Sequence, residues 1–345
     1  MLFKNAELFN VAEILPAADG RGGYDLFRLP ADVRAEADEG LRVRTSHFTC
    51  GMEIRFVINS GKARVTLRTA AAIPTDPAPQ YGQIVTYYGG VQANWQTAFY
   101  RYTDQPTTLE IDPPPSLPQL EKLTLLNGYP YSPQVVRLCL NNSPAVLVDI
   151  EGDIRPPQED EVPLVRGLMY GSSITHGSLA LVANNFIPAV VGRRLRADIC
   201  NLGFAGCCHL EKSVADYIAS RDDCDFFFSE LGINVVGYMS AEEFEKRVRY
   251  YINTAASAHA GKYFIVTDMY YSNHDLMGDP KAEQFREIVR RACEESECAN
   301  VYYINGLDLL TSSAGLSADL VHPNVDGMAE ISANLSEKMK EIMNL

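Results

Sequence analysis

The sequence has no CxxC pair and no uninterrupted apolar run of the roughly 18–20 residues that a membrane span requires. Its eight cysteines are scattered along the chain, although Cys207 and Cys208 are adjacent. Such scatter is typical of reduced thiols in a cytosolic protein rather than of a secreted disulfide framework. Without a CxxC pair, a structural zinc site is not expected either. We therefore expect a cytoplasmic protein that needs neither a metal nor a cofactor.

Basic residues are also scarce, because 30 Lys and Arg face 44 Asp and Glu and the formal net charge is −14. Nucleic acids and anionic membranes bind to basic faces, so both are excluded as expected partners. A neutral small molecule or an oligosaccharide remains open as a partner, and so does a homo-oligomer. The N-terminal stretch carries Glu7 and Glu13 among its apolar positions, which argues against a signal peptide.

The length of 345 residues favours about two domains, and residues 1–150 read as an all-β domain. Apolar residues alternate with polar ones over 52–58 and 63–67, and Asn59-Ser60-Gly61 between them predicts a hairpin turn. No convincing helical stripe separates the runs in this half. Many short strands with proline-rich turns predict a sandwich or jelly roll. Further strands are expected at 109–111, 123–126, 135–140 and 145–150.

The acidic, proline-containing segment 151–163 predicts a linker, and the pattern changes after it. In residues 164–345, short apolar runs alternate with amphipathic helical patterns, which is typical of a parallel sheet covered by helices on both faces. The strands are expected at 164–170, 199–202, 225–231, 263–266 and 301–304, and the helical stripes begin near Ala241, Phe285 and Met328.

Ligands bind beyond the carboxyl ends of the strands in such α/β folds, so polar residues that follow the apolar runs are candidates for a site. Four segments meet this criterion. They are Gly171 to Gly177 (GSSITHG), Asn201 to Gly206 (NLGFAG), Gly232-Ile233-Asn234, and Asp319 to Asn324 (DLVHPN).

In this order, the four segments resemble the motif blocks of the SGNH (GDSL-type) hydrolases, and the resemblance covers about residues 164–345. It implies a three-layer α/β/α domain. It also implies that Ser173 is the nucleophile, with Ser172 where the family more often has aspartate. The oxyanion donors are then the backbone N–H groups of Ser173 and Gly206 and the side-chain amide of Asn234.

Chemistry supports a serine–histidine–aspartate set independently. A serine hydroxyl becomes a good nucleophile only when a base takes its proton, and an unperturbed histidine has a pKa near 6.5. Asp319 lies three residues before His322, where it can fix the tautomer of the imidazole. Because a general base must be neutral, we expect activity to fall below about pH 6.5.

Two other nucleophilic sites are less well supported. The α/β-hydrolase elbow G-x-S-x-G requires glycine at position 175, where this chain has Thr175. A thiol nucleophile in Cys207-Cys208-His209 is disfavoured because catalytic Cys/His pairs are brought together by the fold rather than by sequence adjacency.

Gly23 to Phe27 (GYDLF) resembles the Gly-x-Asp-Leu-Tyr motif of a β-domain that precedes some SGNH esterases, which are similar to carbohydrate acetyl esterases. Tyr87, Tyr88 and Trp95 are candidates for stacking on sugars, although core positions are more usual for such aromatics. The resemblance implies a serine esterase that removes a short acyl group, such as acetyl, from a carbohydrate. Two alternatives stay open: a non-catalytic carbohydrate-binding protein, and a lipase or thioesterase with a longer acyl pocket.

Overall fold

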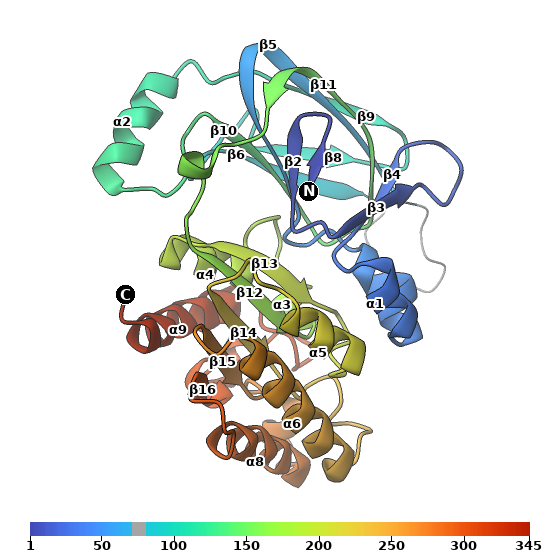
Figure 1. Cartoon of the computed structure of the whole chain (residues 1–345), viewed down its shortest axis with the longest axis vertical. Helices are drawn as coiled ribbons and strands as arrows, with labels where there is room; N and C mark the ends of the chain where they lie inside the picture. The colour runs from blue at the N-terminus through green and yellow to red at the C-terminus, as the bar shows by residue number, and fades with distance from the viewer. Residues whose placement is uncertain (71–80) are drawn as a thin grey trace.

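The structure is a computed structural model that describes residues 1–70 and 81–345. Two sheets of different kinds divide the chain, with an antiparallel β-domain above and an α/β domain below in Figure 1. The predicted fold class is therefore confirmed. None of the helices in the described ranges is long and apolar enough to cross a membrane.

The β-domain is built on one 11-stranded sheet whose central path is β3-β4-β11-β5-β10-β6-β7. Ile54, Phe56, Val65 and Leu67 of β5 are buried in its core, as the alternation of apolar residues predicts. The strands are β1 (Leu2–Phe3), β2 (Ala6–Phe9), β3 (Glu13–Pro16), β4 (Tyr24–Phe27), β5 (Glu53–Thr69), β6 (Gly82–Tyr88), β7 (Val91–Gln92), β8 (Phe99–Tyr102), β9 (Thr107–Ile111), β10 (Val135–Leu140) and β11 (Ala145–Arg155).

The predicted hairpin at residues 52–67 is wrong, because β5 continues through it as one strand of 17 residues. β11 pairs with β5 on both sides of the expected turn, with register shifts near Asp153. The side chains of Asn59 and Ser60 donate hydrogen bonds to the Asp153 carboxylate at 3.0 and 2.7 Å. The polar residues that resemble a turn therefore form an irregular, exposed part of a long strand.

Two further expectations change in this domain, which also contains α1 (Ala31–Glu36). The strand expected at 123–126 is wrong, because these residues belong to α2 (Leu117–Asn127), which Gly128 ends in the left-handed conformation at φ 59°. β11 also extends five residues into the segment predicted as a linker. There, Glu151 and Asp153 are exposed, Arg155 is half-buried and Ile154 alone is buried, so the charges do not oppose strand formation.

The second domain has a five-stranded parallel sheet in the order β13-β12-β14-β15-β16. Leu168 and Tyr170 of β12 pack in the core beneath α5, α6 and α8, whereas Met169 faces α4 and α9. The sheet is thus covered on both faces (Figure 1). Its elements are β12 (Arg166–Gly171), α3 (Ser173–His176), α4 (Ile187–Leu195), β13 (Asp198–Gly203), α5 (Lys212–Ala219), β14 (Phe226–Glu230), α6 (Ala241–Ala258), β15 (Tyr263–Thr267), α7 (Asn273–Leu276), α8 (Pro280–Glu294), β16 (Val301–Ile304) and α9 (Val325–Met343).

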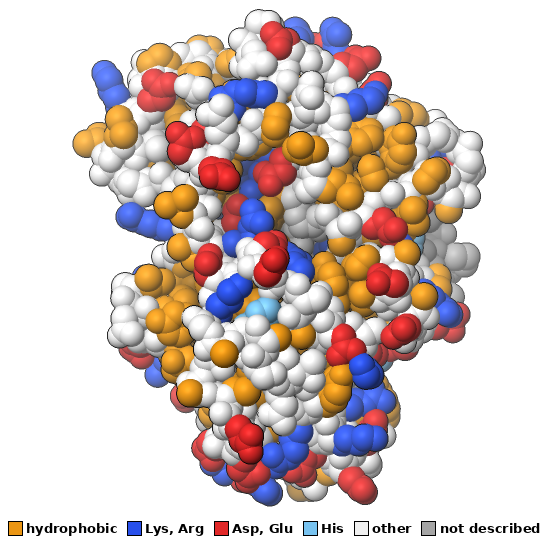
Figure 2. All heavy atoms as spheres, in the orientation of Figure 1, with side chains coloured by type: hydrophobic (Ala, Val, Ile, Leu, Met, Phe, Trp, Pro, Cys, Tyr) orange, Lys and Arg blue, Asp and Glu red, His pale blue; other side chains and the backbone are white. Residues whose placement is uncertain are grey.

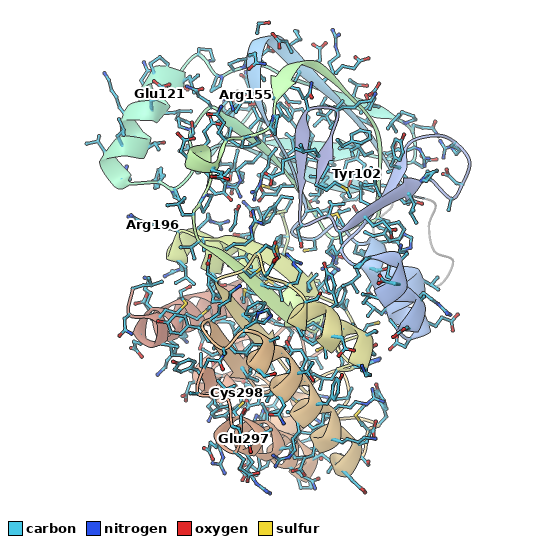
Figure 3. The ribbon with its side chains drawn as sticks, in the orientation of Figure 1. Tyr102, Glu121, Arg155, Arg196, Glu297 and Cys298 are labelled. Atoms are coloured by element: carbon cyan, nitrogen blue, oxygen red, sulfur yellow. The ribbon has the colours of Figure 1, made fainter. Side chains whose placement is uncertain are left out.

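The β-domain packs against β13, which is an edge strand of the parallel sheet. Arg28 donates a hydrogen bond to the Gly203 carbonyl at 2.7 Å, and Asn10 donates one to the Asn201 carbonyl at 3.1 Å. Arg196, labelled beside α4 in Figure 3, donates to the carbonyl of Asn127 at the end of α2 at 3.2 Å. These contacts fix the β-domain beside the edge strand β13 of the parallel sheet. The carboxyl ends of the parallel strands lie together at one edge of the sheet, where α/β folds bind ligands.

Candidate active site

Ser173 lies two residues after the end of β12, as the first residue of the short helix α3. The preceding Ser172 caps this helix, because its hydroxyl accepts a hydrogen bond from the Ile174 N–H at 3.1 Å. The Ser173 hydroxyl lies 2.7 Å from Nε2 of His322. A serine and an imidazole at this distance can exchange a proton.

His322 and Asp319 occupy the loop that precedes α9. Nδ1 of His322 lies 2.7 Å from the Asp319 carboxylate, whose other oxygen accepts hydrogen bonds from the N–H groups of Val321 and His322, both at 2.9 Å, and from the Ser317 hydroxyl. Partial burial works in the opposite direction, but these bonds hold the pKa of Asp319 below its ordinary value. The carboxylate is therefore ionised and positioned to orient the imidazole.

The three predicted oxyanion donors follow β12, β13 and β14, which are neighbours in the sheet. Gly206 has φ 70°, a conformation that favours glycine. Asn234 accepts a hydrogen bond from the Cys208 N–H at 3.0 Å through its side-chain oxygen, so the NH₂ group of its amide does not take part in this contact. This bond joins the two loops that carry the predicted donors Gly206 and Asn234.

Sequence reasoning missed Glu230, the last residue of β14. Its carboxylate is fully buried and accepts hydrogen bonds from the N–H and the hydroxyl of Ser172, each at 2.8 Å, and from the Thr175 hydroxyl at 3.1 Å. Burial raises the pKa of Glu230 to about 7. Glu230, on a neighbouring strand, thus holds the turn at Ser172, the position where the family more often has aspartate.

The thiol alternative has no support in the geometry. Cys207 and Cys208 are both buried, and burial raises the pKa of each thiol. His209 instead contacts Asp38 of the β-domain. Among the described residues, the one group that brings metal-ligating atoms together is Asp38, His209 and Glu211, whose ligand atoms lie within 4.8 Å of one another.

The three aromatic residues considered for sugar stacking differ in their exposure to solvent. Tyr87 and Tyr88 are buried in the β-domain, whereas the side chain of Trp95 is 88% exposed. Tyr88 also donates a hydrogen bond to the carbonyl of Asp112 at 2.7 Å, which is a structural contact. Of these aromatics, Trp95 alone presents its ring to solvent.

A model of the GDSL-like lipase/acylhydrolase family matches residues 166–340, which is just over half of the chain. The chain belongs to this family. The match spans β12 to α9 and includes every segment of the candidate site. No curated protein sequence matches the chain.

Solved structures resemble both domains together. A salicylyl-acyltransferase from a tetracycline biosynthetic pathway has a TM-score of 0.77 at 17% identity, with 99% of this chain and 96% of that chain covered. A family two carbohydrate esterase from Cellvibrio japonicus has a TM-score of 0.64 at 12% identity, with coverage of 99% and 96%. An acetyl xylan esterase from Butyrivibrio proteoclasticus has a TM-score of 0.53 at 11% identity, with coverage of 85% and 90%. This GDSL-family chain therefore has the two-domain fold of the family two carbohydrate esterases.

Proposed function

We propose that this GDSL-family hydrolase is a serine esterase that removes a short acyl group, acetyl above all, from a carbohydrate. The observation that carries the proposal is the hydrogen-bonded series from the Ser173 hydroxyl through His322 to Asp319, with 2.7 Å at each step. The substrate class is supported by the shared fold of the carbohydrate esterases. Eight free thiols, seven of them buried, are consistent with work in the cytoplasm.

In this mechanism, Oγ of Ser173 attacks the ester carbonyl carbon while Nε2 of His322 takes the hydroxyl proton. Asp319 stabilises the imidazolium that forms. The tetrahedral oxyanion accepts hydrogen bonds from the N–H groups of Ser173 and Gly206 and from the Asn234 amide. His322 then gives its proton to the departing alcohol, and water hydrolyses the acyl-enzyme to release the acid.

The test is acetate release from a panel of acetylated oligosaccharides, with the Ser173→Ala variant run in parallel. We expect release by the wild-type protein and none above background by the variant. Labelling by a serine-directed phosphonate, followed by peptide mapping, is expected to modify Ser173. Undiminished hydrolysis by the variant contradicts the role of Ser173.

The same experiments distinguish the two alternatives. A protein that binds acetylated oligosaccharide but resists the phosphonate is a carbohydrate-binding protein on a hydrolase frame. A higher kcat/KM for octanoyl than for acetyl esters indicates a lipase or thioesterase with a longer acyl pocket. We expect the acetyl ester to be preferred.

A second candidate reaction is acyl transfer to an acceptor other than water. It is favoured by the salicylyl-acyltransferase, which shares the fold over nearly the whole of both chains. The chemistry needs the same acyl-enzyme on Ser173, because only the second nucleophile differs. Partitioning of the acyl group between water and added alcohols separates the two reactions, and we expect hydrolysis to dominate.

A further inference from the structure

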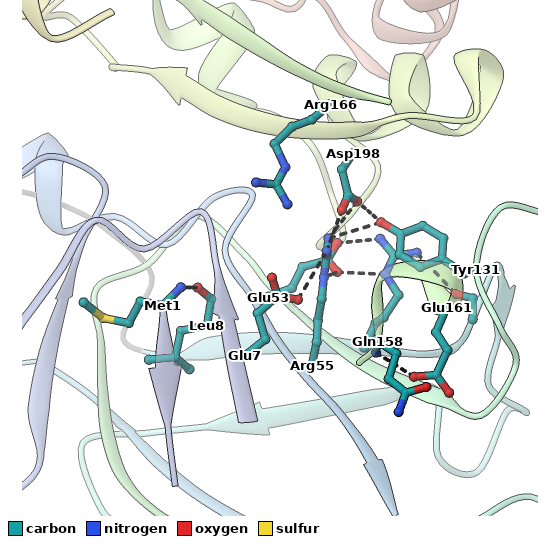
Figure 4. A network of polar contacts seen from close by, with 12 residues as sticks. Met1, Glu7, Leu8, Glu53, Arg55, Tyr131, Gln158, Glu161, Arg166 and Asp198 are labelled. Atoms are coloured by element: carbon teal, nitrogen blue, oxygen red, sulfur yellow. Dashed lines mark hydrogen bonds and ion pairs between the residues drawn. The ribbon is translucent and has the colours of Figure 1, made fainter. Parts of the chain in front are cut away.

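A cavity of about 230 Å³ lies between the two domains, away from the Ser173–His322 pair. The β-domain lines it with Met1, residues 7–12 and Arg28, and the α/β domain lines it with Arg166, Cys200, Tyr217, Arg221 and Asp223. Figure 2 shows a hollow between the two domains in which basic and acidic side chains gather. In Figure 4, Arg166 extends from the parallel sheet into the space that faces Glu7.

The charges that line this cavity do not balance, because three arginines face two carboxylates. Asp223 serves two of the arginines: it accepts bonds from Arg221 at 2.6 and 2.9 Å and one from Arg166 at 3.2 Å. Glu7, the other carboxylate, lies 3.7 Å from the guanidinium of Arg55, and Arg55 does not line the cavity. The lining therefore carries an excess of positive charge.

Arg28 is the most unusual of the three arginines. It is 1% exposed, and within residues 1–70 and 81–345 no carboxylate oxygen lies within 4.0 Å of its guanidinium. Its terminal nitrogens contact the carbonyls of Asn201, Gly203 and Thr45 and the ring of His176. Its Nε is buried and has no hydrogen-bond partner among the described residues.

An unpaired charge is costly to bury. In agreement with this, burial lowers the pKa of the Arg28 guanidinium to about 10. An anion bound in the adjoining cavity would supply the missing counter-charge. Guanidinium groups bind phosphate-type oxyanions through paired N–H donors, and Arg166 and Arg221 bring further donors to the same space.

We propose that this interdomain cavity binds a small oxyanion of the phosphate class, held by Arg28, Arg166 and Arg221. Because Arg28 comes from the β-domain and the other two from the α/β domain, the ligand stabilises the contact between the domains. Arg28 also bonds to Gly203, three residues before the predicted oxyanion donor Gly206. This site is independent of the esterase proposal, since none of the three arginines belongs to the proposed reaction.

The test compares thermal unfolding of the full chain in inorganic phosphate and in sodium chloride at equal ionic strength, with titration calorimetry to give Kd. We expect a saturable rise of Tm in phosphate, because a ligand that binds the folded state stabilises it. Arg166→Gln, at a side chain that is 32% exposed, is expected to raise Kd at least tenfold. Arg64→Gln is the matched control, because Arg64 lies on β5 and pairs with Glu110.

Equal Tm values in phosphate and chloride, or equal Kd values for wild type and Arg166→Gln, overturn the proposal. Arg221→Gln serves as a second variant, and circular dichroism checks that both variants fold. A second titration, with glycerol phosphate in place of inorganic phosphate, identifies the source of the oxyanion. Tighter binding of glycerol phosphate assigns the oxyanion to a phosphorylated metabolite, and tighter binding of inorganic phosphate assigns it to the free ion; both results support the site.

Discussion

The carboxylate of Glu230 accepts hydrogen bonds from both the N–H and the hydroxyl of Ser172, each at 2.8 Å. Ser172 is the residue immediately before the candidate nucleophile Ser173. The other carboxylate oxygen of Glu230 is buried without a partner among the described residues. A side chain on the neighbouring strand β14 thereby fixes the turn at the end of β12.

Replacing Glu230 tests this support directly. In Glu230→Ala, three donors on Ser172 and Thr175 lose their acceptor, and leaving buried donors unpaired costs about 1–3 kcal/mol of unfolding free energy. We also expect kcat to fall, because the turn that carries Ser173 loosens. Glu230→Gln keeps one side-chain oxygen as an acceptor and is expected to retain more of both properties. Urea unfolding and turnover of a chromogenic acetate ester measure the two effects, and identical behaviour of the two variants contradicts the positioning role.

The same residue predicts a pH dependence of stability. Burial raises the pKa of Glu230 to about 7 from 4.5, so the folded state holds this proton more tightly than the unfolded state. The stability that protonation contributes is present below pH 4.5 and is lost as the pH rises through 7. At 1.4 kcal/mol per unit of pKa, the total loss of unfolding free energy is about 3–4 kcal/mol.

Because Gln cannot ionise, the unfolding free energy of Glu230→Gln is expected to decline less than that of the wild type between pH 5 and pH 8. The comparison of the two proteins cancels the contributions of other acidic groups. Denaturant unfolding at several pH values gives the two curves, and parallel curves exclude a raised pKa at this position.

The parallel-sheet domain was predictable because local pattern and tertiary environment agree there. The apolar run 225–231 becomes β14, and the helical stripe from Ala241 becomes α6. The motif segments then lie where a parallel sheet places ligands. The support from Glu230 was not predictable, because its contacts depend on strand pairing that no local pattern records.

The β-domain was predicted less accurately, for identifiable reasons. The run Leu123–Leu126 reads as a strand by its composition, but it belongs to α2, which has Pro118 in its first turn and Gly128 after its end. Leu125 and Leu126 are both more than 80% exposed, so their hydrophobicity does not report burial. The signals that identify this helix were the proline and the glycine at its ends.

Ser173→Ala is expected to abolish hydrolysis of a chromogenic acetate ester while leaving the fold intact. Loss of a serine nucleophile typically reduces kcat by roughly 10⁴–10⁶-fold. Stability changes little, because the Ser173 hydroxyl contacts His322 at the site rather than the core. Ser257→Ala, on the exposed face of α6, is the matched control and is expected to retain full activity. Comparable losses in both variants would indicate a general effect of the substitution.

Asp319→Asn tests the orientation of His322. The amide is nearly isosteric but favours the wrong imidazole tautomer, so we expect kcat to fall by about 10²–10⁴-fold with a smaller change in KM. Because hydrogen bonds hold the pKa of Asp319 below its ordinary value, its protonation does not limit activity in the wild type between pH 5 and pH 8. Steady-state kinetics across this range measure both effects. A variant with wild-type kcat excludes a role for Asp319 in the reaction.

A buried ion network, drawn beside Arg166 in Figure 4, joins the two domains. Arg55 of β5 bonds to both oxygens of Asp198 at 2.7 and 2.9 Å and to Glu53 at 2.8 Å, and Glu53 in turn binds Arg137. Arg55 and Asp198 are only 1% and 2% exposed. The arginines hold the pKa of Glu53 at about 2 against its burial, so the network is ionised at neutral pH.

Removing one member of this network leaves an unpaired buried charge, so Arg55→Leu is expected to lower the unfolding free energy by about 3–5 kcal/mol. Arg64→Leu removes an exposed ion pair from the same strand and is expected to cost at most about 1 kcal/mol. The double variant Arg55→Leu with Asp198→Leu removes both charges across the domain boundary, and it is expected to be more stable than Arg55→Leu alone. Calorimetric unfolding of the wild type and the three variants measures these differences. If Arg55→Leu unfolds like Arg64→Leu, the network does not hold the domains together.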